Sequence, residues 1–201
     1  MIDRYTKEGK HKDSFKLSIL ILTIEDRQKE LKLLLDILLS QLPYNDESIE
    51  ILVHKGGGSI GQKRNELIDE SMGEYVCFID DDDVVVTDYI FQILEAVKDN
   101  PDCVELKGMY YIDGNEVKIF HHSIYCGVDN TGNPYWEDED KYYRCPNHLN
   151  TVKRSIAVRY PFPEKNHGED TDFAMDMYKD GVLKTEGRID KIIYHYLYKN
   201  K

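Results

Sequence analysis

The sequence lacks several features that define large classes of protein. None of its apolar stretches approaches the roughly 20 residues that a transmembrane helix needs. Residues 1–15 are polar and charged, so we expect no signal peptide there. Only four cysteines are present, and no two have the Cys-x-x-Cys spacing of zinc sites and redox motifs. Reduced thiols therefore fit best, and we predict a cytoplasmic protein without a membrane span.

Positive charge is also in short supply. The chain has 26 Lys and Arg against 38 Asp and Glu, which gives a formal net charge of −12. Binding to nucleic acid or to anionic membranes through charge alone requires a clustered basic surface. We therefore do not expect a nucleic-acid partner. A local groove of five cations could still serve one, and these cations are Lys141, Arg144, Lys153, Arg154 and Arg159.

The first half of the chain alternates strands and helices. Apolar runs at residues 17–22, 49–53 and 75–79 predict buried strands. A leucine stripe over residues 31–42, a segment capped by Ser59 that runs to residue 69 or 70, and residues 89–97 predict helices. This alternation predicts a parallel, doubly wound α/β sheet. With 201 residues and 41% hydrophobic content, one compact domain over residues 1–201 is expected.

The second half has a different pattern. Residues 103–112 and 116–120 flank an Asp-Gly turn, which predicts a β-hairpin. Residues 129–140 form a polar loop, residues 151–158 a short helix, residues 170–179 a helix with an acidic first turn, and residues 192–197 a final strand. We therefore expect a mixed or antiparallel β addition to the parallel sheet.

The most informative stretch is the strand that ends in four aspartates, Asp80 to Asp83. Four carboxylates at the end of a buried strand repel one another unless they are solvated or share a cation. Mg²⁺ and Mn²⁺ prefer oxygen ligands, and ligands of open α/β sheets bind outside the carboxyl ends of strands. If side chains alternate here, Asp80 and Asp82 face one way, with Asp81 and Asp83 on the other side. The run predicts a metal-assisted site for a phosphate-bearing ligand.

Two other segments carry candidate chemistry. The glycine-rich residues 56–61 lead into a helix with Lys63 and Arg64, and free amides at its start would favour a phosphate. Residues 167–173 begin a helix whose Asp170 or Asp172 either caps it or serves as a general base. His195 lies between two tyrosines. It is either a residue packed on a strand or a metal ligand.

Taken together, these pieces resemble the inverting nucleotide-sugar glycosyltransferases of the family 2 type, which have the GT-A fold. In that family a first strand ends in a threonine-containing loop, here residues 22–27, and an Arg-Asn helix follows a glycine loop, here residues 61–67. An Asp-x-Asp-Asp cluster and a later Glu-Asp motif correspond to residues 80–83 and 168–173. The match covers residues 17–181.

The resemblance implies a division of labour. Residues 17–100 would bind the nucleotide, and residues 101–201 would bind the acceptor and supply the base. The donor would be a nucleotide sugar of the UDP type, the cofactor Mn²⁺ or Mg²⁺, and the acceptor a hydroxyl on a glycan, a small molecule or a modified DNA base. Asp170 would be the catalytic base, oriented by Glu169. The implied metal ligands are Asp80, Asp82 and His195, and the implied donor-binding residues are Thr23, Glu25, Arg64, Asn65, Asp80 and Asp81.

One departure from the family concerns the nucleotide. The family usually has an aspartate after the second strand that reads the base, whereas His54 and Lys55 stand here. Neither side chain accepts a hydrogen bond as a carboxylate does. The base is therefore left open.

Two other classes of protein remain as alternatives. The string around Asp80 resembles the first motif of dehalogenase-type phosphatases, in which the leading aspartate is the nucleophile. A noncatalytic module for nucleotide sugars or carbohydrates would stack a sugar on the aromatic residues Tyr135, Trp136, Tyr142 and Tyr143. A specialised form of the glycosyltransferase would be a viral enzyme that modifies DNA bases.

Overall fold

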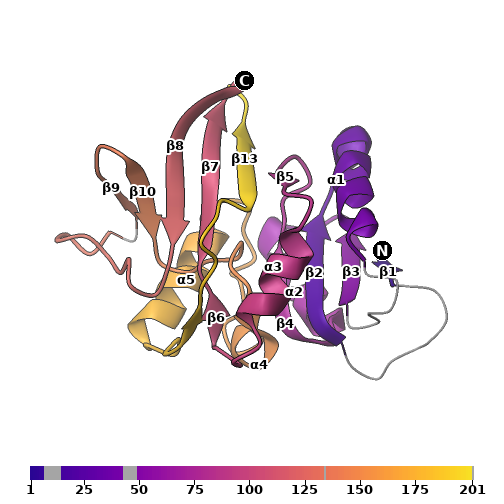
Figure 1. Cartoon of the computed structure of the whole chain (residues 1–201). Coiled ribbons are helices and arrows are strands. Elements are labelled where there is room, and N and C mark those ends of the chain that lie inside the picture. Colours follow the sequence, from indigo (N-terminus) through magenta and orange to yellow (C-terminus); the bar gives the residue numbers. More distant parts are fainter. Residues whose placement is uncertain (7–14, 43–48, 134, 201) are drawn as a thin grey trace.

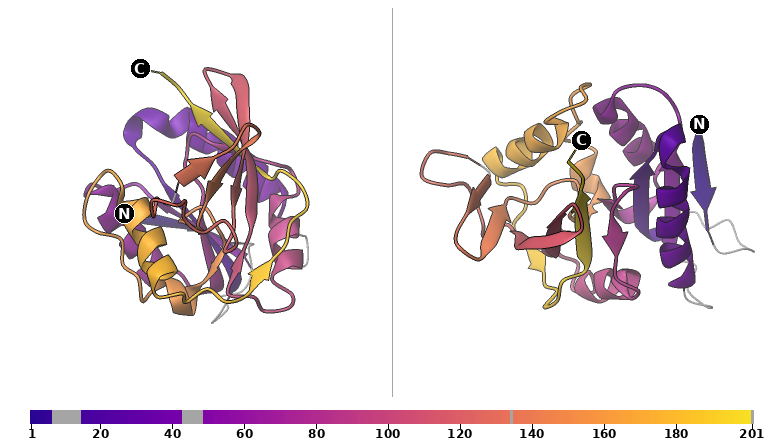
Figure 2. Two further views of the ribbon diagram at one scale, coloured as in Figure 1. Left: turned by 90° about the vertical axis from the view of Figure 1, so that its left-hand side faces the viewer. Right: turned by 90° about the horizontal axis from the view of Figure 1, so that it is seen from above.

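Two β-sheets lie side by side in this chain (Figure 1). The computed structural model describes residues 1–6, 15–42, 49–133 and 135–200. Residues 7–14 of the polar start, over which no signal peptide is expected, lie outside this description. Strand β1 and the β9–β10 hairpin lie at opposite sides of the molecule (Figures 1 and 2).

The first sheet has seven strands in the order β1-β3-β2-β4-β11-β6-β12. Its centre consists of β3 (Ile49–His54), β2 (Phe15–Leu22) and β4 (Gly73–Phe78), which run parallel. These strands are buried along nearly their whole length, as expected for a sheet that is covered on both faces. The outer strands are short: β1 (Ile2–Tyr5), β6 (Cys103–Val104), β11 (Val152–Lys153) and β12 (Glu186–Gly187).

Helices cover both faces of the first sheet. On one face, α1 (Gln28–Ser40) and α3 (Tyr89–Ala96) pack against a core that contains Ile19 and Ile51. On the other face, α2 (Ile60–Glu70), α4 (Arg154–Ala157) and α5 (Glu169–Lys179) contribute to a second core with Leu20 and Leu52. Neighbouring residues of one strand thus serve opposite faces, because strand side chains alternate. The prediction of a doubly wound sheet is confirmed.

The second sheet has six strands in the order β5-β13-β7-β8-β10-β9. They are β5 (Val84–Val85), β13 (Tyr194–Tyr198), β7 (Leu106–Ile112), β8 (Asn115–His122), β10 (Lys141–Arg144) and β9 (Tyr135–Glu137). The pairing is mixed, because β7 and β8 form the predicted antiparallel hairpin whereas β13 runs parallel to β7. One hydrophobic cluster joins side chains of this sheet, such as Phe120, to those of the first sheet.

The elements of the second half differ in detail from the prediction. The expected strand over residues 103–112 is interrupted at Glu105, where the chain passes from β6 in the first sheet to β7 in the second. The expected helix over residues 151–158 is strand β11 followed by the four-residue helix α4. Among the described residues, no helix has both the length and the apolar character that crossing a bilayer requires.

Candidate active site

The acidic run begins directly after β4 and turns. The backbone N–H of Asp83 donates to the carbonyl oxygen of Asp80 at 3.1 Å, the bond of a β-turn. Side chains do not alternate regularly in a turn, and Asp81 and Asp82, which were expected on opposite sides, both contact Arg27. Asp80 and Asp82 nevertheless remain more exposed than Asp81 and Asp83.

Arg27 comes from the loop after β2, in the short 3₁₀ helix η1 (Glu25–Arg27). Its Nη1 lies 2.8 Å from Asp81 Oδ1 and 3.0 Å from Asp82 Oδ1. The pKa of Asp82 is nevertheless raised, chiefly by burial and then by the charges of Asp81 and Asp80, which together outweigh Arg27. Arg27 alone therefore does not offset the burial of Asp82 and the charges of its neighbours.

Asp83 has a structural role. Its carboxylate accepts hydrogen bonds from the Tyr194 hydroxyl at 2.7 Å and from the Leu197 backbone N–H at 2.8 Å. Burial, followed by the charge of Asp80, raises the pKa of Asp83 to about 8. These bonds fasten β13 of the second sheet to the turn that follows β4.

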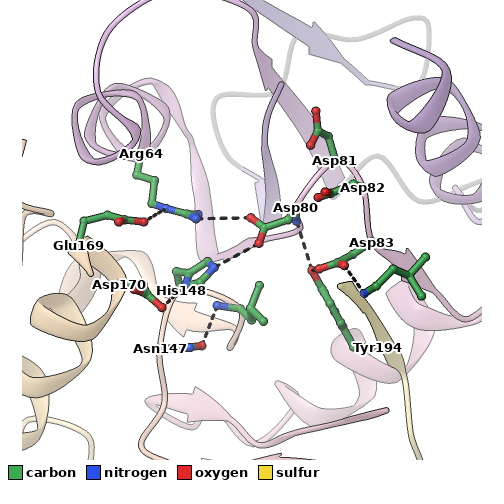
Figure 3. A network of polar contacts seen from close by, with 12 residues as sticks. Arg64, Asp80, Asp81, Asp82, Asp83, Asn147, His148, Glu169, Asp170 and Tyr194 are labelled. Atoms are coloured by element: carbon green, nitrogen blue, oxygen red, sulfur yellow. Dashed lines mark hydrogen bonds and ion pairs between the residues drawn. The ribbon is translucent and has the colours of Figure 1, made fainter. Parts of the chain in front are cut away.

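Arg64 of α2 links the acidic turn to α5 (Figure 3). Its Nη2 lies 3.4 Å from Asp80 Oδ1, and its Nε lies 3.4 Å from Glu169 Oε1. The guanidinium is buried over the ring of Phe78, 4.9 Å from the ring centre. Glu169 was expected to orient Asp170, but the contact of its carboxylate is with Arg64.

Asp170 lies in the first turn of α5. The residue before the helix is Gly168, whose φ of 73° lies in the left-handed region that favours glycine and which has no side chain to cap the helix. Asp170 Oδ2 is 3.2 Å from Arg144 Nη2. Burial alone would raise the pKa of Asp170, but the neighbouring His148 and Arg144 outweigh it and lower this pKa. Asp170 is thus an ionised carboxylate at physiological pH.

His148 lies between the two acidic groups, and the sequence analysis missed it. Its Nε2 is 3.8 Å from Asp80 Oδ2, and its Nδ1 is 3.8 Å from Asp170 Oδ2 (Figure 3). Burial and the charge of Arg64 lower the pKa of His148. Burial would raise the pKa of Asp80, but His148 and Arg64 lower it. The only local signal was the pair of asparagines in Asn-His-Leu-Asn, which is typical of a tight turn.

A cavity of about 710 Å³ joins these groups. Its polar lining includes Arg64, Asp80, Arg144, His148, Glu169 and Asp170. The second sheet contributes an aromatic wall, formed by Tyr110, Trp136, Tyr142, Tyr143, Tyr196 and Tyr198. Within the wall, the rings of Tyr110 and Tyr196 stack at 5.4 Å and those of Trp136 and Tyr143 at 4.1 Å. The cavity therefore extends from the acidic turn to the second sheet.

Four of the six predicted donor-binding residues, Thr23, Glu25, Asn65 and Asp81, do not line this cavity. Thr23 is buried after β2, where its N–H donates to the carbonyl of His54, and Glu25 is exposed in the following loop. Asn65 exchanges two hydrogen bonds of 2.8 Å with the backbone of Phe162. Asn65 therefore holds the segment before α5 against α2, and its contact with a nucleotide stays a prediction.

The structure does not bring His195 together with the aspartates. Its neighbours Tyr194 and Tyr196 face Asp83 and the cavity, and strand alternation turns His195 to the opposite side of β13. There its Nδ1 lies 3.2 Å from the Tyr111 hydroxyl. His148 is the histidine that lies beside Asp80.

The start of α2 is not the open phosphate site that the glycine loop suggested. The N–H of Ile60 donates to Asn166 Oδ1, that of Gly61 to the Lys165 carbonyl, and that of Gln62 to Ser59 Oγ. The expectation of free amides is wrong, because residues 163–166 dock on this helix end. A Cβ on Gly61 would lie 1.9 Å from the Pro163 carbonyl oxygen, so glycine serves close packing there.

His54, which stands where the family usually has a base-reading aspartate, is fully engaged within the protein. Its Nδ1 accepts from the Gly56 N–H at 3.0 Å, so the ring proton is on Nε2, which donates to Glu66 Oε2 at 2.7 Å. Both ring nitrogens are therefore occupied. The base of a nucleotide must be recognised by other groups.

The acidic turn fits a divalent cation that arrives with a phosphate ligand. Asp80 and Asp82 keep 29% and 30% of their side-chain surface exposed, whereas Asp81 and Asp83 are buried. In the part of the chain that the structure describes, no three His, Cys, Asp or Glu side chains gather as a metal cluster. Mg²⁺ and Mn²⁺ often take phosphate oxygens beside one or two carboxylates. Asp80 and Asp82 match that donor set.

The sequence matches the model of a known family. Residues 28–162, which include α1, the acidic turn and His148, match "Glycosyl transferase family 2". The chain therefore belongs to glycosyl transferase family 2, and the prediction of a glycosyltransferase is confirmed at the level of the family. No curated protein matches the sequence.

Solved structures of S. aureus TarS resemble the fold. The structure of S. aureus TarS residues 1–349 in complex with UDP-GlcNAc has a TM-score of 0.65 and 15% identity, over 93% of this chain and 60% of that one. The complex of the same fragment with UDP has a TM-score of 0.64 and 17% identity, over 92% and 61%. The structure titled S. aureus TarS has a TM-score of 0.63 and 16% identity, over 92% and 37%. These matches confirm the GT-A-like fold, and this chain spans 37–61% of those chains.

Proposed function

We propose that this chain is a metal-dependent glycosyltransferase that moves a sugar from a UDP-sugar to an acceptor hydroxyl with inversion. The observation that carries the proposal is the shared cavity. Asp80, at the end of a donor-side strand, and Asp170, at the start of α5, line the same space, with His148 3.8 Å from each. A donor held at one carboxylate and a hydroxyl held at the other would meet there.

Asp170 is the general base of this reaction. Its lowered pKa keeps it ionised, which a base requires before it accepts a proton. The acceptor oxygen attacks the anomeric carbon, the bond from that carbon to the diphosphate breaks, and the proton of the hydroxyl passes to Asp170. Arg144, 3.2 Å away, holds the carboxylate in place. A single displacement of this kind inverts the anomeric centre.

Asp80 and Asp82 would hold the divalent cation, as Mg²⁺ or Mn²⁺. A bound cation supplies charge that stabilises the departing diphosphate. Arg64 and Arg27 add positive charge around the same carboxylates. Because Asp82 has a raised pKa, a cation beside it relieves repulsion within the run.

The uridine nucleotide is proposed because the TarS complexes contain UDP and UDP-GlcNAc. Thr23, Glu25 and Asp81 lie around the loop at the carboxyl end of β2, where this fold class binds nucleotides. With His54 engaged by Glu66, recognition of the base falls to this loop.

The acceptor would occupy the aromatic wall of the cavity. Tyrosine and tryptophan faces favour a ring-shaped acceptor, such as a sugar residue of a glycan or a small molecule. A modified DNA base also has a ring that aromatic faces can stack on, but the net charge of −12 opposes a nucleic-acid chain. The four unpaired cysteines support a cytoplasmic location for this reaction.

The test separates the metal role from the base role. Calorimetry measures UDP binding with and without Mn²⁺, and UDP release from UDP-sugars is measured with a panel of mono- and oligosaccharide acceptors. Asp82→Asn should weaken Mn²⁺-dependent UDP binding by about tenfold or more. Asp170→Asn should leave UDP binding unchanged while transfer falls by about 10²-fold or more. Full transfer by Asp170→Asn would exclude Asp170 as the base, whereas a wild type that binds UDP-sugars but transfers to no acceptor would favour a noncatalytic binding module.

A further inference from the structure

His148 is held rigidly at the junction of the two sheets. Its backbone carbonyl accepts from the Phe78 N–H at 3.1 Å, on the strand that carries the acidic turn. Asn147 Oδ1 accepts from the Leu149 N–H, and Asn150 Oδ1 accepts from the Asn147 N–H, so the turn is closed on both sides. The imidazole therefore has a fixed place.

Both ring nitrogens of His148 are buried, and neither has a hydrogen-bond partner among the described residues. The residue is only 7% exposed. A buried polar atom left without a partner costs about 1–3 kcal/mol, so native proteins rarely keep one without a reason. Because His148 lines the cavity, a bound molecule is positioned to supply the missing partners.

The distances indicate where those partners lie. The 3.8 Å separations from Nδ1 to Asp170 Oδ2 and from Nε2 to Asp80 Oδ2 exceed the hydrogen-bond range. An oxygen atom placed beside either pair reaches both members at hydrogen-bond distance. The oxygen beside Nδ1 and Asp170 has the position of the attacking hydroxyl, and the oxygen beside Nε2 and Asp80 lies on the donor side.

We propose that His148 is a catalytic residue that binds both substrates in the proposed reaction, on which this inference depends. Its Nδ1 contacts the acceptor hydroxyl that Asp170 deprotonates, and its Nε2 contacts a hydroxyl of the sugar being transferred. The proton still passes to Asp170, and His148 fixes the direction of attack. One imidazole thus sets the distance between nucleophile and donor sugar.

His54 is a buried histidine whose surroundings contrast with those of His148. Both nitrogens of His54 are bonded within the protein, at 3.0 and 2.7 Å. A single metal ion does not explain His148 either, because Asp80 and Asp170 face different ring nitrogens. Two separate hydroxyl groups account for both faces of the ring.

Two conservative variants separate the two contacts. An asparagine amide nitrogen approximates the place of Nδ1, and a glutamine amide nitrogen approximates that of Nε2. The probes are UDP and whichever of UDP-glucose, UDP-galactose and UDP-GlcNAc the wild type binds most tightly, each with Mn²⁺. Binding is measured by calorimetry, transfer is measured at saturating donor with the acceptor panel, and thermal unfolding confirms that each variant folds.

His148→Asn should bind UDP normally but the UDP-sugar about tenfold more weakly, with transfer at saturating donor largely kept. His148→Gln should bind both like the wild type, while transfer falls by about 10- to 100-fold. Each variant is the control for the other. Wild-type behaviour of both variants, or an equal loss in both, would overturn the assignment. Failure of the wild type to bind UDP or any UDP-sugar with Mn²⁺ would overturn the proposed function itself.

Discussion

The polar groups beside β3 and those between the two sheets are similarly buried but differently partnered. Beside β3, His54 is bonded to Gly56 and Glu66, and the amides at the start of α2 are taken by protein oxygens. Between the sheets, Arg64 Nη1 and both nitrogens of His148 have no hydrogen-bond partner in residues that the structure describes. These groups around His54 and the start of α2 are therefore satisfied within the protein, and the groups between the sheets are not.

This difference separates residues that build the site from residues that face substrate. A satisfied buried group keeps its neighbours in place, whereas an unsatisfied one at a cavity wall gains a partner when a molecule binds. Arg64 belongs to both kinds. Its Nη2 and Nε contact carboxylates, whereas its buried Nη1 has no hydrogen-bond partner among the described residues. Changing it therefore gives the strongest test of the contrast.

Arg64→Met should cause the largest loss of stability. The substitution leaves the buried carboxylate of Glu169 and the neighbouring Asp80 without their cation, and breaking a buried ion pair from one side costs about 4 kcal/mol. Urea unfolding of the protein without ligand measures this free energy. Arg64→Lys keeps the charge without the fork geometry and should lose less.

A double variant shows whether the loss has this cause. Adding Glu169→Gln to Arg64→Met removes one uncompensated charge, so the double variant should recover part of the lost stability. A double variant less stable than Arg64→Met alone would mean that Arg64 acts through packing on Phe78 instead.

Gly61→Ala should cause the next largest loss of stability, because it disturbs the packing of α2 against residues 163–166. The new Cβ would lie 1.9 Å from the Pro163 carbonyl oxygen, a backbone atom that cannot move alone. Overpacking of this kind costs about 3 kcal/mol. Gly57→Ala is the matched control, since a Cβ there meets nothing within 4 Å. Equal stability of the two variants in urea would show that the segment does not dock as described.

Much of the donor side was predictable because its signals are local. Strand β4 and its aspartates are consecutive in sequence, and the apolar runs of β2 and β3 read directly as buried strands. Ser59 caps α2, since its Oγ accepts from the Gln62 N–H as the sequence indicated. Local pattern failed first at the turn after β4, where one backbone bond redirects the side chains of Asp80 to Asp83.

The junction was not predictable because it depends on contacts distant in sequence. Arg144 and His148 reach Asp170 only after β10 has paired with β8 and the turn at 147–150 has docked on β4. His195 was a candidate ligand through the resemblance to the family, and strand alternation turns it away from the aspartates. No periodicity in a single segment encodes such pairings.

Glu105→Gln should give the smallest effect. It sharpens the contrast between partnered and unpartnered groups, because the Glu105 carboxylate is as buried as the groups between the two sheets but has several partners within the protein. It accepts from Lys107 Nζ at 3.0 Å, from the Ile189 N–H at 2.9 Å, and contacts His121 Nε2 at 3.0 Å. Burial would raise the pKa of Glu105, but these three partners lower it from 4.5 to about 2. Losing the charge at neutral pH should cost about 2 kcal/mol.

The pH dependence of that loss has a definite sign. A carboxylate whose folded pKa lies below its unfolded value binds fewer protons when folded, so its stabilisation is full above about pH 4.5 and disappears as the pH falls towards 2. Urea unfolding of the wild type and Glu105→Gln should therefore differ by a constant amount from about pH 7 to 5 and converge below pH 4. A gap that stays constant down to pH 3 would show that Glu105 stabilises the junction by shape rather than by charge. In that case, the presence or absence of partners within the protein would no longer separate the buried groups that build the site from those that face substrate.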